Sequence, residues 1–350
     1  MSRILVAMSG GVDSSVAAAL LARDGHEVVG VTMKLLDKSE ADGASCASCC
    51  GYDASRDARL VAEAIGIPHY TVNAVEVFRQ TVISDFVREY RAGRTPNPCV
   101  RCNQFVKFGF LMNRADELGC EFVATGHYAL RRGNRLYRGI DPGKDQAYFL
   151  YVIYGAAIER IVFPVGGRTK SEIRGIAAEL RLVTAHKPES QDICFVEDGN
   201  YSAIFENTAL SGEGTMVDTR GKEVGRHAGI HKYTVGQRKG LGALGKKMFV
   251  KEIRPLENVV VVGTEDDLWA ETMIVNHAVV AHDYRIDGSI DYDVQVRYRS
   301  KPVKARISQS DSKTFHIKLL EPVRAIAPGQ SAVIYDGTMV VGGGVIERAG

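Results

Sequence analysis

ILVAMSGGVDSS, residues 4–15, joins an apolar run to a glycine turn. This order predicts a buried strand that turns through Gly10 and Gly11 into the start of a helix. Glycine adopts turn dihedrals that a β-carbon opposes, and the first turn of a helix leaves backbone N–H groups unpaired. The stretch therefore predicts an anion cradle for phosphate groups. No Lys follows in the GxxxxGK[ST] spacing, so the motif is not a Walker P-loop.

Apolar strands alternate with amphipathic helices through about the first 180 residues. The clearest strands are Val28–Met33, Ile67–Val72 and Phe122–Thr125, and helices are expected over about 53–65 and 78–91. This alternation predicts an α/β fold with a doubly wound parallel sheet, whose loops at the carboxyl ends of the strands carry function.

The second half of the chain has a different character. Past about residue 205 glycines multiply and short β-branched runs replace helical periodicity. We expect a catalytic ATP-binding domain over 1–200, a small mixed central domain over 201–269 and a C-terminal β-barrel over 270–350.

Composition limits the class of protein. The chain has 350 residues, a net charge of +2 and no apolar run near the roughly 20 residues of a membrane span. We expect a cytoplasmic protein without a membrane partner. Its seven cysteines are an odd number in uneven clusters, a pattern typical of thiol chemistry or metal ligation rather than of a secreted disulfide framework.

Two separated segments supply candidate reactive thiols. In PNPCVRCN, residues 96–103, a helix is expected to begin near Cys102, where the helix N-terminus and Arg101 would lower the thiol pKa. Cys194 lies far downstream in a loop-like segment. Two such cysteines can carry sulfur as a persulfide and resolve it as a disulfide.

Basic residues concentrate in the central segment. Ten Lys or Arg stand against two Glu between Arg220 and Arg254, which suits a polyanion, although a solvated face with no partner has the same composition. Arg297-Tyr298-Arg299 is expected in a strand, where Arg and Tyr can meet a phosphate and a stacked base.

Several motifs together resemble a known family. SGGVDSS, TPNPCVRCNQFVKF, ATGHYA, KDQAYFL, FPVGGRTKSEIR, KPESQDICF, GIHKYTVGQRKGLG and APGQSAVIYDG stand in this order along the whole chain. They resemble the bacterial tRNA-specific 2-thiouridylases, which belong to the ATP pyrophosphatase superfamily. The resemblance implies ATP-dependent replacement of the 2-oxygen of a wobble uridine by sulfur, with tRNA and an upstream sulfur donor (a cysteine desulfurase or a sulfur carrier) as partners.

The resemblance also implies site residues. Cys102 would be the nucleophile and Cys194 the persulfide carrier, and Asp13 would help to place Mg²⁺. The residues implied to bind ATP are Ala7, Met8, Ser9, Gly10, Gly11, Val12, Asp13, Ser14, Met33 and Gly126. The residues implied to contact the target base or the rest of the tRNA are Asn97, Pro98, Cys99, His127, Lys144, Asp145, Gln146, Arg297, Tyr298 and Gln330. A structural imidazole is the alternative for His127.

Cys99 leaves the mechanism open, because familiar members carry Asp at this position. Cys99, Cys102 and Cys194 could together ligate a four-iron four-sulfur cluster, the alternative to the persulfide, or Cys99 could be inert. Cys46, Cys49 and Cys50 fit either a zinc site or a loop over the nucleotide. A small-molecule ATP pyrophosphatase and a non-catalytic tRNA-binding module are the other functions that the sequence allows.

Overall fold

The computed structural model describes residues 1–36, 52–155, 158–188, 193–195, 204, 212–242, 244 and 247–350. Two compact units emerge: residues 1–82, 99–201 and 338–340 form the first, and residues 83–98, 202–337 and 341–350 form the second. Cys46, Cys49, Cys50 and Lys246 lie outside the described residues.

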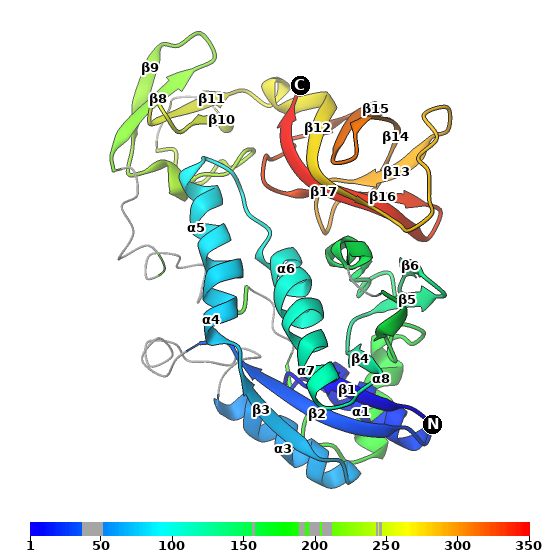
Figure 1. The fold of residues 1–350 in the computed structure, drawn as a ribbon. Helices are drawn as coiled ribbons and strands as arrows, with labels where there is room; N and C mark the ends of the chain where they lie inside the picture. The colour runs from blue at the N-terminus through cyan, green and yellow to red at the C-terminus, as the bar shows by residue number, and fades with distance from the viewer. Residues whose placement is uncertain are drawn as a thin grey trace. The chain divides into compact units, whose positions relative to one another are not determined.

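A five-stranded parallel sheet organises the first unit (Figure 1). Its strands are β1 (Arg3–Ala7), β2 (Glu27–Lys34), β3 (His69–Asn73), β4 (Phe122–Thr125) and β7 (Ile161–Val162), in the order β3-β2-β1-β4-β7. All neighbouring pairs are parallel. The predicted doubly wound sheet is confirmed. Strand order reverses between β1 and β4, the point where such sheets bind ligands.

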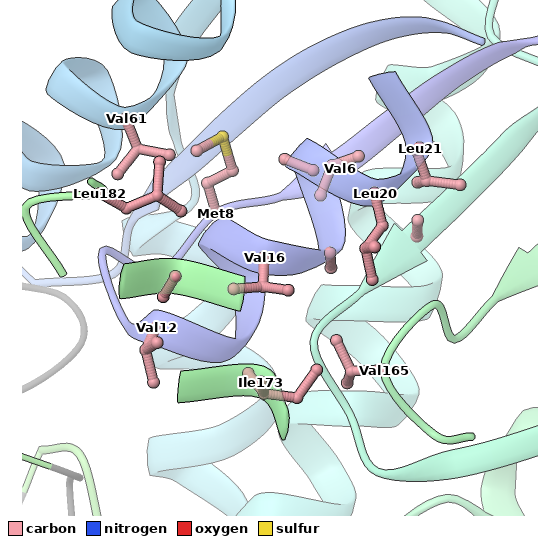
Figure 2. Close-up of a cluster of buried hydrophobic side chains, with 14 of the residues drawn as sticks. Val6, Met8, Val12, Val16, Leu20, Leu21, Val61, Val165, Ile173 and Leu182 are labelled. Atoms are coloured by element: carbon pink, nitrogen blue, oxygen red, sulfur yellow. The ribbon is translucent and has the colours of Figure 1, made fainter. Parts of the chain in front are cut away.

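Three helices share a buried cluster with β1 (Figure 2). They are α1 (Val12–Arg23), α3 (Tyr52–Ile65) and α8 (Lys170–Glu179). Ile4 and Val6 of β1 share this cluster with Val16 and Ile173, while Leu5, which lies between them in the strand and is also buried, belongs to the opposite face. Both faces are therefore apolar, as a parallel sheet requires. A capping box of Thr169 and Glu172 opens α8.

The remaining helices of the first 160 residues form two consecutive runs along the sequence. α4 (Val75–Phe78), η1 (Arg79–Ile83) and α5 (Ser84–Arg91) succeed one another, with η1 in π conformation. α6 (Pro98–Arg101), the π-helix η2 (Cys102–Phe110) and α7 (Leu111–Glu117) do the same, and α7 contacts β1 and β4. β5 (Ala129–Arg132) and β6 (Arg135–Arg138) form an antiparallel hairpin. The short 3₁₀ turns are η3 (Ala147–Phe149), η4 (Tyr151–Gly155) and η5 (Ile158–Arg160).

A four-stranded mixed sheet follows in the second unit. It contains β8 (Gly214–Asp218), β9 (Glu223–His227), β10 (Phe249–Arg254) and β11 (Val259–Gly263), in the order β10-β11-β8-β9, with the short turn η6 (Ile230–Lys232) after β9. Only the β11–β8 pair is parallel. Met216, Val250, Val260 and Val262 are buried beneath it.

The last six strands close on themselves. After η7 (Asp266–Leu268) come β12 (Trp269–Val280), β13 (Tyr292–Gln295), β14 (Val303–Asp311), β15 (Thr314–Arg324), β16 (Ser331–Asp336) and β17 (Met339–Ala349). The order β12-β15-β14-β13-β16-β17 is closed by a β12–β17 pairing. The predicted C-terminal barrel is thus confirmed. Within the described ranges no helix is long and apolar enough to cross a membrane.

Candidate active site

The glycine turn after β1 is held by its own side chains. Ser14 Oγ accepts a hydrogen bond from Ser9 N at 3.1 Å and donates to Gly11 O at 3.1 Å. Gly10 has φ +67°, and a β-carbon there would lie 2.1 Å from the carbonyl oxygen of Ala54 on α3. Glycine is therefore required at this position for both dihedral and space. The serine hydroxyl stabilises the turn, which leaves anion binding to the backbone N–H groups.

Asp13, in the first turn of α1, is held by two residues from distant parts of the sequence. Lys170 Nζ lies 2.7 and 2.8 Å from the two carboxylate oxygens, and the Tyr128 hydroxyl donates to Oδ1 at 2.7 Å. The Lys170 side chain is 12% exposed. Lys170 thus places a cation beside the predicted phosphate cradle, a role that the sequence analysis missed.

The loop after β4 lies directly against the glycine turn. A β-carbon on Gly126 would lie 2.6 Å from Ser14 N and 2.7 Å from the carbonyl carbon of Asp13. The carboxyl ends of β1 and β4 therefore meet, as expected at the point where strand order reverses. Met33 is the penultimate residue of β2 and half-buried. Its predicted adenine contact and that of Gly126 remain predictions.

His127 connects this loop to the helix that carries Cys102. Its Nδ1 lies 2.7 Å from Thr125 Oγ1, and its Nε2 lies 3.2 Å from Lys107 Nζ. A lysine ammonium only donates, so Nε2 accepts and Nδ1–H donates to Thr125. Lys107 lies in η2, five residues beyond Cys102. These contacts suit the structural imidazole, and the implied tRNA contact of His127 remains a prediction.

Burial and the nearby Lys107 charge hold the pKa of His127 well below its usual range. The unfolded chain takes up a proton near pH 6.5 while folded His127 stays neutral, so stability that is present above pH 6.5 is lost as pH falls toward the folded pKa. We expect His127→Gln to remove up to about 1.4 kcal/mol per pH unit from the acid slope of the unfolding free energy. Urea unfolding between pH 5 and 7.5 measures this. An unchanged slope would contradict the buried neutral imidazole.

The two candidate thiols lie on segments that each contact α4. Cys102 is the first residue of η2 and is buried, while Cys194 is half-buried in a turn. The next residue, Phe195, packs edge-on against Phe78 of α4 with ring centroids 5.4 Å apart, and α4 contacts η2. The Phe78 contact therefore anchors the Cys194 turn to α4, the same helix that contacts the segment of Cys102.

The expected start of the Cys102 helix is wrong. The helix begins at Pro98, so Cys102 is its fifth residue and lies beyond the first turn. Proline is favoured at the first helical position, because its fixed φ suits a helix and its missing N–H is not needed there. The first-turn thiol is that of Cys99, which is exposed.

The cluster alternative finds no support in this arrangement and remains a hypothesis. Cys99, Cys102 and Cys194 are all described, yet no group of three or more His, Cys, Asp or Glu in the described ranges is placed to hold a metal ion. A cluster would require three thiolates around one centre. We derive no step through such a group.

The implied tRNA residues near β4 have internal roles. Asp145 accepts from Gly139 N at 2.9 Å and from Arg138 Nη1 at 2.8 Å, and its side chain is 8% exposed. Gln146 exchanges hydrogen bonds with the backbone of Tyr128, the partner of Asp13. Lys144, half-buried, precedes them. Asp145 and Gln146 therefore order the segment that presents Tyr128, and tRNA contact by this trio remains a prediction.

The implied tRNA residues of the second unit also make defined contacts. Gln330 Nε2 donates to Thr95 O at 3.1 Å and to Pro96 O at 3.0 Å, just before Asn97 and Pro98. Arg297 and Tyr298 were expected in a strand, which is wrong: β13 ends at Gln295, and a turn follows in which Ser300 N donates to Arg297 O.

The central basic segment forms a turn organised by Gln237. Its Nε2 donates to Lys232 O at 3.1 Å and to Lys239 O at 2.9 Å, while its Oε1 accepts from Thr234 N at 3.1 Å. The side chains of Lys232, Arg238 and Lys239 are exposed around it. One amide thus fixes the backbone of a cationic loop.

Comparison with known proteins covers the whole chain. Family models match residues 2–198 (tRNA methyl transferase HUP domain), 204–264 (tRNA methyl transferase PRC-barrel domain) and 270–346 (aminomethyltransferase beta-barrel domain). A tRNA-specific 2-thiouridylase of Magnetococcus marinus is 45% identical over 98% of this chain and 98% of its own length. The chain belongs to the tRNA-specific 2-thiouridylase family. Two other tRNA-specific 2-thiouridylases are similarly related. That of Thermoanaerobacter sp. is 43% identical over 99% of this chain and 98% of its own length. That of Geobacter metallireducens is 44% identical over 99% of this chain and 97% of its own length. The three matched ranges lie within 1–200, 201–269 and 270–350, a domain division that we retain as a proposal.

Proposed function

We propose that the protein is an ATP-dependent tRNA-uridine 2-sulfurtransferase that acts on the wobble uridine. One observation carries the proposal beyond family membership: Gly126 packs on the phosphate turn, and the adjacent His127 is bonded to the helix of Cys102. A nucleotide on that turn and a thiol on that helix would then serve one substrate.

The first step is adenylation of the uracil. The 2-oxygen attacks the α-phosphorus of ATP and pyrophosphate leaves, which converts a poor leaving group into AMP. Backbone N–H groups of residues 9–14 would receive the phosphates, and Lys170 would exchange its Asp13 contact for phosphate oxygens. One carboxylate together with phosphates suits Mg²⁺, so Asp13 would hold the ion, whose charge neutralises pyrophosphate.

The second step replaces AMP by sulfur. The terminal sulfur of a Cys194 persulfide attacks C2, AMP leaves, and Cys102 thiolate then attacks Cys194 Sγ so that the sulfur stays on the base. Alternatively, Cys102 first releases hydrosulfide from the persulfide, and hydrosulfide attacks C2. Both routes end in a Cys102–Cys194 disulfide that a two-electron reductant reopens. An upstream cysteine desulfurase or sulfur carrier would reload Cys194.

The test is direct product analysis. tRNA incubated with enzyme, ATP, Mg²⁺, a persulfide donor and reductant is digested and analysed for 2-thiouridine by mass spectrometry. We expect 2-thiouridine at the wobble position, with one AMP and one pyrophosphate for each thiouridine, and none when ATP is omitted. Pyrophosphate release that depends on a small molecule instead of tRNA would refute the assignment.

A separate prediction concerns tRNA binding by the cationic loop around Gln237. Changing Lys232, Arg238 and Lys239 together to Ala removes up to three phosphate contacts, so the slope of log affinity against log salt should fall by about 2 to 3. ATP affinity should persist. A Lys304→Ala/Arg306→Ala control removes two barrel cations that are paired with Asp293 and Asp291. Equal salt slopes in the wild type and the triple variant would exclude the loop as a tRNA contact.

A further inference from the structure

Arg94, three residues before Asn97, is fixed by two carboxylates of the second unit. Its Nε lies 2.8 Å from Glu89 Oε2 on α5, its Nη1 pairs with Glu347 of β17, and its Nη2 donates to Ile346 O at 3.2 Å. The Arg94 side chain is 18% exposed and that of Glu89 is 14% exposed. A guanidinium shared by three acceptors has one orientation, and at this burial it is more than a surface ion pair.

The backbone of the next two residues, Thr95 and Pro96, is also held by several contacts. Thr95 N donates to Pro328 O at 2.8 Å, and Gln330 Nε2 donates to the carbonyls of Thr95 and Pro96. A β-carbon on Gly329 would lie 2.7 Å from Thr95 O, so the backbones of these two segments are in direct contact. Both prolines of this segment also restrict the residues before them. The contacts with Pro328, Gly329 and Gln330 therefore fix the backbone that leads into Asn97.

The same segment also meets the cationic loop. Thr95 Oγ1 donates to Thr234 Oγ1 at 3.2 Å, and Thr234 N is bonded to Gln237, which organises that loop. Residues 94–96 thus join α5, the central sheet region and the barrel within one unit. The next residues are those implied to border the target base.

We propose that Arg94, with Glu89 and Glu347, and Gln330 are positioning residues that fix the start of the target-base segment, Asn97 and Pro98, on the C-terminal barrel. The proposal rests on the proposed function. It gives Gln330 an intramolecular role, because its amide nitrogen is directed at two carbonyls of its own chain. A base-binding segment displaced by 1 Å loses rate rather than binding energy, since the tRNA is held over a much larger surface.

The test compares turnover with binding. We expect Arg94→Met and Gln330→Met to lower kcat for tRNA thiolation about 10- to 100-fold, and Glu347→Gln about 3- to 10-fold. The tRNA Kd, the ATP Kd and persulfide loading of Cys194 should each stay within about 3-fold of wild type. Lys304→Met is the matched control, because Lys304 pairs with Asp293 on the barrel of the same unit and its side chain is 55% exposed.

Three results are decisive. A lower kcat with unchanged affinities supports positioning. A kcat within 2-fold of wild type in folded variants overturns the proposal, and so does a loss of activity that follows a proportional rise in tRNA Kd, which would make these residues tRNA contacts. If Arg94→Met does not fold, the same comparison of kcat with the tRNA and ATP Kd is made on Glu347→Gln and Gln330→Met. A wild-type enzyme without thiolation would instead refute the proposed function.

Discussion

Replacing Cys102 with Ser is expected to lower tRNA thiolation by at least about 10³-fold, and Cys194→Ser by as much, because each removes a sulfur atom that the transfer uses. Adenylation needs neither thiol. Both variants should therefore still release pyrophosphate when tRNA and ATP are present. Parallel assays of 2-thiouridine and pyrophosphate measure the separation.

Cys120→Ala provides the control for general cysteine loss. Cys120 is buried, burial raises its pKa, and its thiol donates weakly to Leu118 O at 3.9 Å. This variant should thiolate at close to the wild-type rate once corrected for the folded fraction. Normal thiolation by the Cys102→Ser/Cys194→Ser double variant would reject sulfur transfer by these residues.

Lys170→Met is expected to slow tRNA-dependent pyrophosphate release about 10²- to 10³-fold, since it removes the cation next to the phosphate turn. The rate should fall further than the loss of one phosphate contact alone would cause. Without Lys170, only Mg²⁺ balances the negative charge of Asp13 next to the phosphates. Adding Asp13→Asn should recover part of the rate if this repulsion contributes.

Lys187→Met is the matched control for Lys170→Met. Lys187 also forms a lysine–aspartate pair in the first unit, with Asp57 at 2.5 Å, and its side chain is 27% exposed. We expect at most a twofold change in its pyrophosphate release. Equal rates for the Lys170 and Lys187 variants would show that Lys170 serves only the fold.

Local sequence predicted the parts of the site that local physics dictates. Gly10 needs a positive φ and has no space for a β-carbon, so a glycine after an apolar strand is informative by itself. Thr169 and Glu172 satisfy each other across one helical turn, which makes the start of α8 readable. The strand alternation similarly predicted the parallel sheet.

Long-range pairings could not be read in the same way. Lys170 meets Asp13 across 157 residues, and Gln330 meets Pro96 across 234. No periodicity or motif spacing records such a contact, because topology brings the residues together. The resemblance marked Gln330 only as a tRNA contact. Its hydrogen bonds to the carbonyls of Thr95 and Pro96 are seen only in the structure.

The errors concerned the boundaries of regular structure. A helix was expected to begin near Cys102, but it begins at Pro98, because proline suits a first helical turn. Arg297 to Arg299 alternate like a strand, but Ser300 closes a turn through their backbone. In both places the local sequence is compatible with two backbone conformations, and tertiary contacts determine which one forms.

The most direct test is a single turnover without reductant. Enzyme loaded with persulfide on Cys194 is mixed with ATP and tRNA, and both protein and tRNA are analysed by mass spectrometry. We predict one 2-thiouridine for each enzyme and a Cys102–Cys194 disulfide formed at the same rate. Thiouridine formed while both thiols remain reduced would contradict the account.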